Sequence, residues 1–231
     1  MSTYRGSNPH AFCLDAGARV LAADIDEDGL GTLTASDRLH CTALDIGNSA
    51  AVERAINAWA EKAGRIDAAV ITSAVQKRAP IEETSDEDWH RHLQVNLTGV
   101  FHLIRCLMPI MKHQRAGSIV AFTSGLATNG WPGAAAYAAS KAGIVGLVKC
   151  AALELRPFGV RVNALSPGLV ATPVFLNSAS DEELAMYERT VGVSAPDEVV
   201  PSIMHLISDA SATISGTVVE RRLIPRAPGR E

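Results

Sequence analysis

Residues 117–147 read GSIVAFTSGLATNGWPGAAAYAASKAGIVGL, and this stretch decides the fold class. Its first part, residues 117–124, is a short apolar run of the kind that forms a buried parallel strand. A helix is predicted over residues 134–157, because apolar side chains recur there at helical spacing: Ile144, Leu147, Val148, Ala151 and Leu155. The stretch therefore predicts a strand that leads into a long helix.

The same alternation of strand and helix continues on both sides of this unit. Strands are predicted over residues 18–24, 67–73 and 159–166, and helices over residues 49–63 and 86–114. This order predicts an α/β fold with a doubly wound, Rossmann-like parallel sheet, and 231 residues fit a single domain, 1–231. Ligands in such sheets bind at the carboxyl ends of the strands, so functional residues are expected there.

Composition and charge argue against several classes of function. The net charge of −4 disfavours nucleic acid or an anionic membrane surface as a partner. No apolar run reaches the ~18 residues of a membrane-spanning helix, and the N-terminus lacks the pattern of a secretory signal. The four cysteines are scattered, and His90 and His92 do not share a helix face, so no metal site is predicted. We expect a cytoplasmic protein with reduced thiols.

Tyr137 and Lys141 are four residues apart on the predicted helix, so their side chains lie on one face. A nearby ammonium lowers the pKa of a tyrosine from about 10, which suits a general acid/base. The pair alone is weak evidence for a catalytic role, because the same spacing recurs on exposed helices. Ser124 ends the preceding strand, where its hydroxyl can hydrogen-bond a substrate carbonyl. Asn96 lies mid-helix among apolar neighbours, so it needs a buried partner such as a water chain to a lysine.

Several ordered segments resemble the short-chain dehydrogenase/reductase (SDR) family over residues 17 to 216. They are QVNLTGVF around Asn96, the stretch from Trp131 to Leu147, and VNALSPGLVATP after the next strand. The resemblance implies an enzyme that transfers a hydride between NAD(P) and a small secondary alcohol or ketone. Tyr137 would be the general acid/base, and Lys141 would lower its pKa and bind the ribose. Ser124 would polarise the carbonyl, and Asn96 would hold the water of a proton relay.

The resemblance also implies positions for the cofactor. Asp24 ends the strand ARVLAAD, where the family places an acid on the adenosine ribose; this favours NAD over NADP, although a simple strand-end acid would look the same. The family's adenine-contacting pair corresponds to Asp45 and Ile46, and its asparagine-rich motif beside the cofactor to residues 71–74, which include Thr72. The turn along the nicotinamide corresponds to residues further on: Pro167, Gly168, Val170 and Thr172.

The chain departs from the family at three places. The glycine-rich loop that carries the pyrophosphate would begin before Met1, and only Gly6 falls on one of its glycines. The first strand and this loop are therefore expected to be missing or remodelled, with residues 1–16 a divergent N-terminus. The asparagine-rich motif reads Ile-Thr-Ser-Ala here. Residues 217–231, VVERRLIPRAPGRE preceded by Thr, resemble a tail more than a buried strand.

The family places a variable substrate lid after the Pro-Gly turn, here over residues 173–195. Trp131 either walls the substrate pocket or packs under the lid, and Gln76 and Arg78 are candidates to reach substrate. In the family, two long helices pair across a subunit interface. The resemblance thus implies a homodimer or homotetramer through the helices near 86–114 and 134–157.

Three functions remain open from the sequence. The first is an NAD-dependent oxidoreductase that interconverts a secondary alcohol and a ketone. The second is a cofactor-independent dehydratase, isomerase or cyclase on the same scaffold, because Ser124, Tyr137 and Lys141 can move protons without a hydride donor. The third is a catalytically inactive SDR-like partner subunit.

Overall fold

The computed structural model describes residues 9–172, 175–176 and 179–223. Gly6 and parts of the expected lid and tail lie outside these residues. The strands are β1 (Val20–Asp24), β2 (Leu39–Ala43), β3 (Ala68–Ile71), β4 (Gly117–Phe122), β5 (Val160–Ser166) and β6 (Val218–Glu220). The helices are α1 (Pro9–Asp15), α2 (Glu27–Gly31), α3 (Ser49–Ala63), α4 (Asp86–Leu93), α5 (Gly99–Gln114), α6 (Leu126–Asn129), α7 (Ala135–Leu155), α9 (Asp181–Thr190) and α10 (Val200–Ile207).

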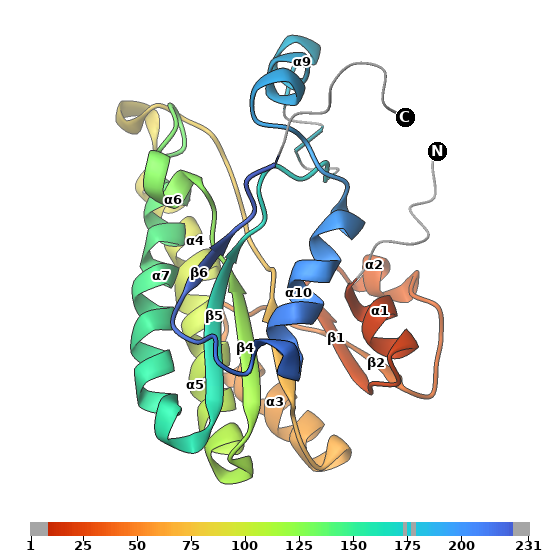
Figure 1. Cartoon of the computed structure of the whole chain (residues 1–231). Helices are drawn as coiled ribbons and strands as arrows, with labels where there is room; N and C mark the ends of the chain where they lie inside the picture. The colour runs from red at the N-terminus through yellow and green to blue at the C-terminus, as the bar shows by residue number, and fades with distance from the viewer. Residues whose placement is uncertain (1–8, 173–174, 177–178, 224–231) are drawn as a thin grey trace.

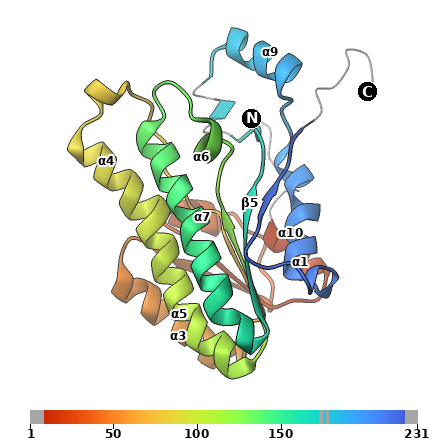
Figure 2. The same ribbon diagram turned by 60° about the vertical axis from the view of Figure 1, so that its left-hand side comes forward.

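All paired strands are parallel, and helices cover the sheet on both faces (Figures 1 and 2). The α3, α5 and α7 helices lie on one face, and α10 packs on the other face against β3 and β4. Side chains of β4 alternate between the two sides: Ile119 and Ala121 join the larger core cluster, and Val120 joins the cluster with α10. The predicted α/β, doubly wound, single-domain fold is confirmed.

The strands form two separate groups. One sheet has the order β3-β4-β5-β6, and the other consists of β1 and β2. Among the described residues no strand lies between β1 and β3, so each of these strands pairs on one side only. In β3, Ala68, Ala69 and Val70 keep part of their exposure, whereas the central residues of β4 and β5 are buried. The described part of the chain therefore lacks a strand where the sequence predicted the loss of one.

Helix α3 spans the predicted residues 49–63. Its N-cap is Asn48, whose side chain accepts a hydrogen bond from the Ala51 amide. Gly64 ends the helix with φ of 79°, a left-handed conformation that glycine adopts without strain. The predicted helix over 86–114 is present but interrupted, because a π-helical turn, Gln94–Thr98, separates α4 from α5.

The expectation for the C-terminal segment is corrected. Residues Val218–Glu220 form the edge strand β6, which pairs with β5 through Ala164↔Val218 and Leu165↔Val219. The two valines are half-buried. The arginines that follow made the segment resemble a tail, but the two valines are enough for a short strand at the sheet edge.

The helical stretches 86–114 and 135–158 are long and apolar enough to cross a membrane by length and composition. In the fold both carry buried core residues, such as Ile104 and Ile144, and they pack beside one another against the sheet (Figure 2). Core helices of soluble proteins have the same composition. Their outer faces expose Phe101 and Leu153. Pairing with a second copy through these faces stays a prediction, which the solution mass of the chain would test.

The open edges of β1 and β3 predict a specific pattern of amide hydrogen exchange. In a parallel strand, successive amides point to opposite sides, so every second amide of β3 faces away from β4 and lacks a strand partner. We expect alternate amides of β1 and β3 to exchange much faster than those of β4, in which both sides are paired. Exchange followed by NMR measures this residue by residue. Equal, slow exchange throughout all three strands would contradict the open edges.

Candidate active site

The end of β4 and the start of α7 bring three predicted catalytic residues together. Ser124 lies two residues beyond β4, and Tyr137 lies in the first turn of α7, where its hydroxyl shares a hydrogen bond with the Ser124 side chain. Lys141 lies one turn further along α7, with its Nζ 5.8 Å from the centre of the Tyr137 ring. The predicted common face of Tyr137 and Lys141 is therefore the face that meets the end of β4.

Burial is the largest influence on the pKa of Tyr137. Loss of solvent raises the pKa of Tyr137 above its ordinary value, and the hydrogen bond from Ser124 opposes this only in part. The predicted lowering of this pKa by Lys141 is therefore not what the structure has. A protonated phenol is the stable form here, which suits donation of a proton to a substrate oxygen.

Lys141 is almost completely buried, with 2% of its surface exposed. Its Nζ donates a hydrogen bond of 2.8 Å to the carbonyl oxygen of Phe122, the last residue of β4. The Thr123 hydroxyl in turn donates to the carbonyl of Lys141 at 2.9 Å. Burial lowers the pKa of the lysine to about 8. The lysine thus fixes α7 on β4 and holds a readily exchanged proton beside Tyr137.

Asn96 lies in the π-helical turn and is fully buried. Its Oδ1 accepts from the Val75 amide at 2.7 Å, and its Nδ2 donates to the Val75 carbonyl and to the Ser140 hydroxyl. The buried partners that the sequence required are therefore protein atoms of the loop after β3 and of α7. The π turn places the amide where it can reach both. The contact of Asn96 with a relay water stays a proposal.

A second residue also fixes the loop after β3. His92 is buried, its Nδ1 lies 2.6 Å from the Asp88 carbonyl, and its Nε2 lies 3.0 Å from the Lys77 amide. The amide can only donate, so Nε2 accepts and Nδ1 carries the proton. Lys77 also forms an ion pair of 2.6 Å with Asp88, and the hydrogen bond from Lys77 lowers the pKa of that carboxyl. This loop carries Gln76 and Arg78.

The expected adenosine positions lie at the ends of β1 and β2. Asp24 is the last residue of β1, is exposed, and accepts from the Asp26 amide through Oδ1. Asp45 is exposed and Ile46 is buried; the Ile46 carbonyl lies 3.0 Å from Nδ1 of His102. The carboxylate of Asp24 therefore faces solvent at the carboxyl edge, as the ribose interpretation requires.

The turn after β5 is held by the segment after β6. Arg221 donates from Nη1 to the Pro167 carbonyl at 2.7 Å and to the Ser194 hydroxyl at 3.4 Å. Gly168 has φ of 75°, and a Cβ there would lie 3.0 Å from the Arg221 carbonyl oxygen, so only glycine fits. A bridge between Val170 and Ser194 continues the turn toward the lid. The other two expected positions, Val170 and Thr172, are half-buried.

The described part of the expected lid contains helix α9. Tyr187 on its underside is buried between Trp131, at a ring distance of 6.0 Å, and Phe175, at 5.9 Å. One turn earlier, Oε1 of Glu183 lies 3.7 Å from Nη1 of Arg78. Trp131 is thus under the lid, yet 45% of its surface is exposed. Thr72 and Gln76 are exposed, and no contact joins either side chain to the catalytic residues among those described.

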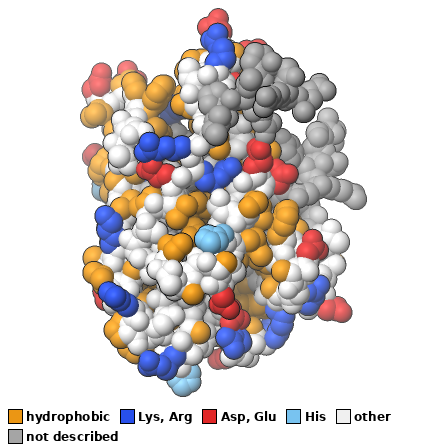
Figure 3. Space-filling model, viewed as in Figure 1, with side chains coloured by type: hydrophobic (Ala, Val, Ile, Leu, Met, Phe, Trp, Pro, Cys, Tyr) orange, Lys and Arg blue, Asp and Glu red, His pale blue; other side chains and the backbone are white. Residues whose placement is uncertain are grey.

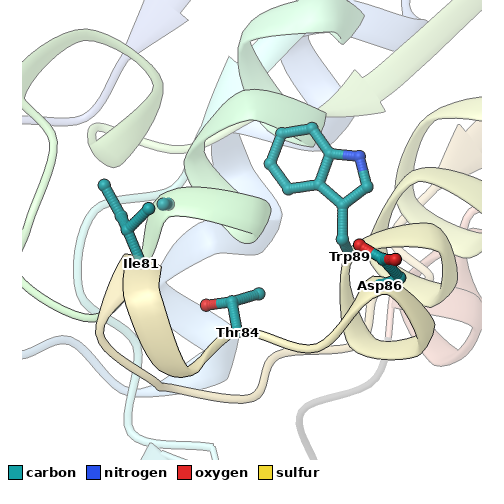
Figure 4. Close-up of a pocket in the computed structure, with 5 residues that line it drawn as sticks. Ile81, Thr84, Asp86 and Trp89 are labelled. Carbon is teal, nitrogen blue, oxygen red and sulfur yellow. The ribbon is translucent and has the colours of Figure 1, made fainter.

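A shallow pocket of about 260 Å³ lies beside the start of α7 (Figure 4). It is lined by Ile81, Thr84, Asp86, Trp89 and Ala135, and Figure 4 shows the Trp89 indole standing above Asp86. Neither Ser124 nor Tyr137 lines it. This pocket is therefore separate from the predicted catalytic residues at the end of β4.

Sequence reasoning missed three contributors to the site. Arg221 was hidden in a segment interpreted as a tail, and no pattern marked it. Val75 contributes only backbone atoms, which a sequence does not reveal. Tyr187 had a usable signal, because an aromatic residue in a predicted lid helix is a candidate to pack against Trp131.

The structure thus combines a parallel α/β fold with a serine, a tyrosine and a lysine that lie together at the carboxyl end of one strand. Comparison with known proteins shows which class of protein has this arrangement. Residues 11–220 match the family described as enoyl-(acyl carrier protein) reductase. The chain is 33% identical over 210 residues to the 3-oxoacyl-[acyl-carrier-protein] reductase FabG of Thermotoga maritima, covering 88% of this chain and 85% of that protein. It is 36% identical over 208 residues to a D-threitol dehydrogenase of Mycolicibacterium smegmatis, covering 87% and 80%.

A cyclopentanol dehydrogenase of a Comamonas species is 30% identical over 211 residues, covering 87% of this chain and 84% of that protein. The chain belongs to the short-chain dehydrogenase/reductase family and is an enzyme of that family, an oxidoreductase. The family resemblance and the enzyme prediction made from the sequence are therefore confirmed.

The buried lysine predicts how stability changes with pH. Its pKa is 10.5 in an unfolded chain and about 8 in the fold. Between these values the unfolded chain binds the extra proton, so the free energy of unfolding rises with pH in this window. Compared with the Lys141→Met variant, the free energy of unfolding of the parent should increase by about 2 kcal/mol between about pH 8 and pH 10.

Urea unfolding of both proteins across this range measures the difference, because all other groups cancel in the comparison. The exposed Lys149 provides the matched control: Lys149→Met should follow the parent at every pH. A difference between parent and Lys141→Met that stays flat or falls with pH would show that Lys141 keeps its proton in the fold.

Proposed function

We propose that this enzyme interconverts a secondary alcohol and a ketone by NAD-dependent hydride transfer, with Tyr137 as the general acid/base. The observation that carries the proposal is the contact between Tyr137 and Ser124, with the Lys141 ammonium behind the tyrosine ring. The names of the relatives support it, since the three compared above are a reductase and two alcohol dehydrogenases.

In carbonyl reduction, the hydroxyl of Ser124 donates a hydrogen bond to the substrate oxygen and polarises the carbonyl. Tyr137 then donates its proton to the same oxygen as negative charge develops there. The raised pKa of Tyr137 keeps the phenol protonated until that charge appears. The Nζ of Lys141, whose pKa is about 8, lies 5.8 Å from the centre of the Tyr137 ring, so in the next half-cycle the proton would return to Tyr137 through a bridging hydroxyl or water. Asn96 and His92 fix the loop that lies beside these residues.

The residues present fit a nicotinamide cofactor at its two ends. When bound, it would supply the hydride. Asp24 offers a solvent-facing carboxylate to the adenosine ribose, and Asp45 and Ile46 would be the adenine-contacting pair. Thr72 belongs to the motif expected beside the cofactor. The Pro167–Gly168 turn, held by Arg221, would lie along the nicotinamide with Val170 and Thr172, and Lys141 would bind the second ribose. The expected pyrophosphate segment lies outside the described residues.

One observation favours an alternative. The open edge between β1 and β3 adjoins the region where a cofactor would lie, so proton-transfer chemistry without a cofactor remains the second candidate. The dehydratase, isomerase and cyclase reactions considered from the sequence need only Ser124, Tyr137 and Lys141. An inactive partner subunit would need none of them.

Replacement of Tyr137 by phenylalanine tests the acid/base role. Tyr137→Phe removes the proton donor and keeps the ring, so NADH-dependent ketone reduction should fall at least about a hundredfold. Circular dichroism and the urea midpoint should stay close to those of the parent. Retention of full activity in a folded Tyr137→Phe protein would reject the mechanism.

Calorimetric titration of the purified chain with NADH and NADPH tests the cofactor. The carboxylate of Asp24 accepts hydrogen bonds from ribose hydroxyls and repels a 2′-phosphate, so NADH should bind at least several times more tightly. Asp24→Asn should narrow this preference, and the exposed Asp28→Asn should not. Equal binding of both nucleotides would show that Asp24 does not contact the adenosine ribose. Absence of binding by the folded chain would favour cofactor-independent chemistry.

A further inference from the structure

Helix α9 meets the body of the enzyme through two contacts that are one helical turn apart. Glu183 faces Arg78 from the loop after β3, and Tyr187 faces Trp131 from the segment between β4 and α7. Residues four apart lie on one face of a helix, so the carboxylate and the aromatic ring sit side by side on the underside of α9. Arg78 and Trp131 are therefore neighbours beneath it.

This place adjoins the catalytic residues. The Ala79 amide, next to Arg78, donates a hydrogen bond of 3.0 Å to the Gly133 carbonyl, and Gly133 lies just before the start of α7, which carries Tyr137. Trp131 and Ser124 belong to the same connection between β4 and α7. The guanidinium and the indole thus border the site at which Tyr137 and Ser124 would hold a carbonyl.

The N–H donors of the Arg78 guanidinium have only a long contact with Glu183. A guanidinium presents five N–H groups in a planar fork that matches a carboxylate. Its contact with Glu183 is 3.7 Å long, beyond the ordinary range of an N–H···O hydrogen bond. Among the described residues no hydrogen bond of its side chain is recorded, and Arg78 is an exposed residue, with a side-chain exposure of 32%, so its donors are accessible to a ligand.

The partner carboxylate is already engaged elsewhere. Oε2 of Glu183 accepts from the Ser180 amide at 3.0 Å, while the Ser180 hydroxyl accepts from the Glu183 amide, and this capping box begins α9. Only Oε1 is directed to Arg78. A second carboxylate could therefore bind the donors of Arg78 while Glu183 keeps its place in the cap.

We propose that Arg78 binds a carboxylate on the far end of the substrate, so that the substrate is a ketone or secondary alcohol with an acidic group. The part between carbonyl and carboxylate would lie against the exposed face of Trp131. The carbonyl half of this statement rests on the proposed function, and the carboxylate half rests on Arg78 alone.

The test compares two ketones, para-acetylbenzoate and its methyl ester, by calorimetry on the full chain; the ester lacks the negative charge and is larger by one methyl group. The parent should bind the acid more tightly than the ester. Arg78→Met should weaken binding of the acid roughly tenfold and leave the ester unchanged, and Arg78→Lys should recover part of the loss. Binding of the acid should weaken with added salt.

Glu183→Gln is the matched control, because its amide oxygen can still accept from the Ser180 amide. It removes the competing charge, so binding of the acid should be equal or tighter. If Arg78 and Glu183 only fasten the lid, both substitutions should act alike on both ketones, and the proposal is overturned. Equal binding of acid and ester by the parent, or no binding of either, overturns it as well.

Reduction of the two ketones with NADH is measured separately. Arg78-dependent binding of the acid without any reduction would sustain the carboxylate site and count against the oxidoreductase proposal for this ketone class. If the ester is reduced and Arg78→Met does not change binding of the acid, the oxidoreductase proposal is supported and the carboxylate site is rejected. The two failures are thus distinguishable.

Discussion

The attachment of α7 to the end of β4 is the constraint on which the site depends. Lys141 donates from Nζ to the Phe122 carbonyl, and Thr123 donates to the Lys141 carbonyl. These two bonds fix the rotation of α7 about its axis, so the face that carries Tyr137 must look toward Ser124. A buried lysine is costly unless it finds such partners, and β4 supplies one from its terminal carbonyl. The placement of Tyr137 and Lys141 is thus set by a helix that is anchored to the end of a strand.

Polar and charged side chains hold the segments around the site together. Arg221 joins the last strand to the Pro167 turn and to Ser194 at the base of the lid, and Asn96 joins the π turn to the loop after β3. Figure 3 shows that hydrophobic side chains also reach the surface in the middle of the face on which α10 lies.

Much of the fold could be predicted from periodicity. The bounds of α3 were predicted to the residue, because an amphipathic run ended at Gly64. Strand β2, LHCTA, was not predicted from the sequence, because it has little apolar pattern and forms through its pairing with β1. The π turn escaped because a one-residue change of helical register leaves apolar spacing almost intact. The spacing placed Tyr137 beside Lys141, but only the fold reveals that burial raises the pKa of the tyrosine.

The two strand groups have a consequence for how the molecule holds together. No backbone hydrogen bonds of a shared ladder join β1 to β3 among the described residues, so packing such as that of α3 on α5 is what couples the two halves. Cooperativity between halves joined in this way is weaker than within a continuous sheet. A ligand long enough to touch Asp24 on one side and the Pro167 turn on the other would add its binding energy to that coupling. Stability and occupancy would then be one linked property of this enzyme.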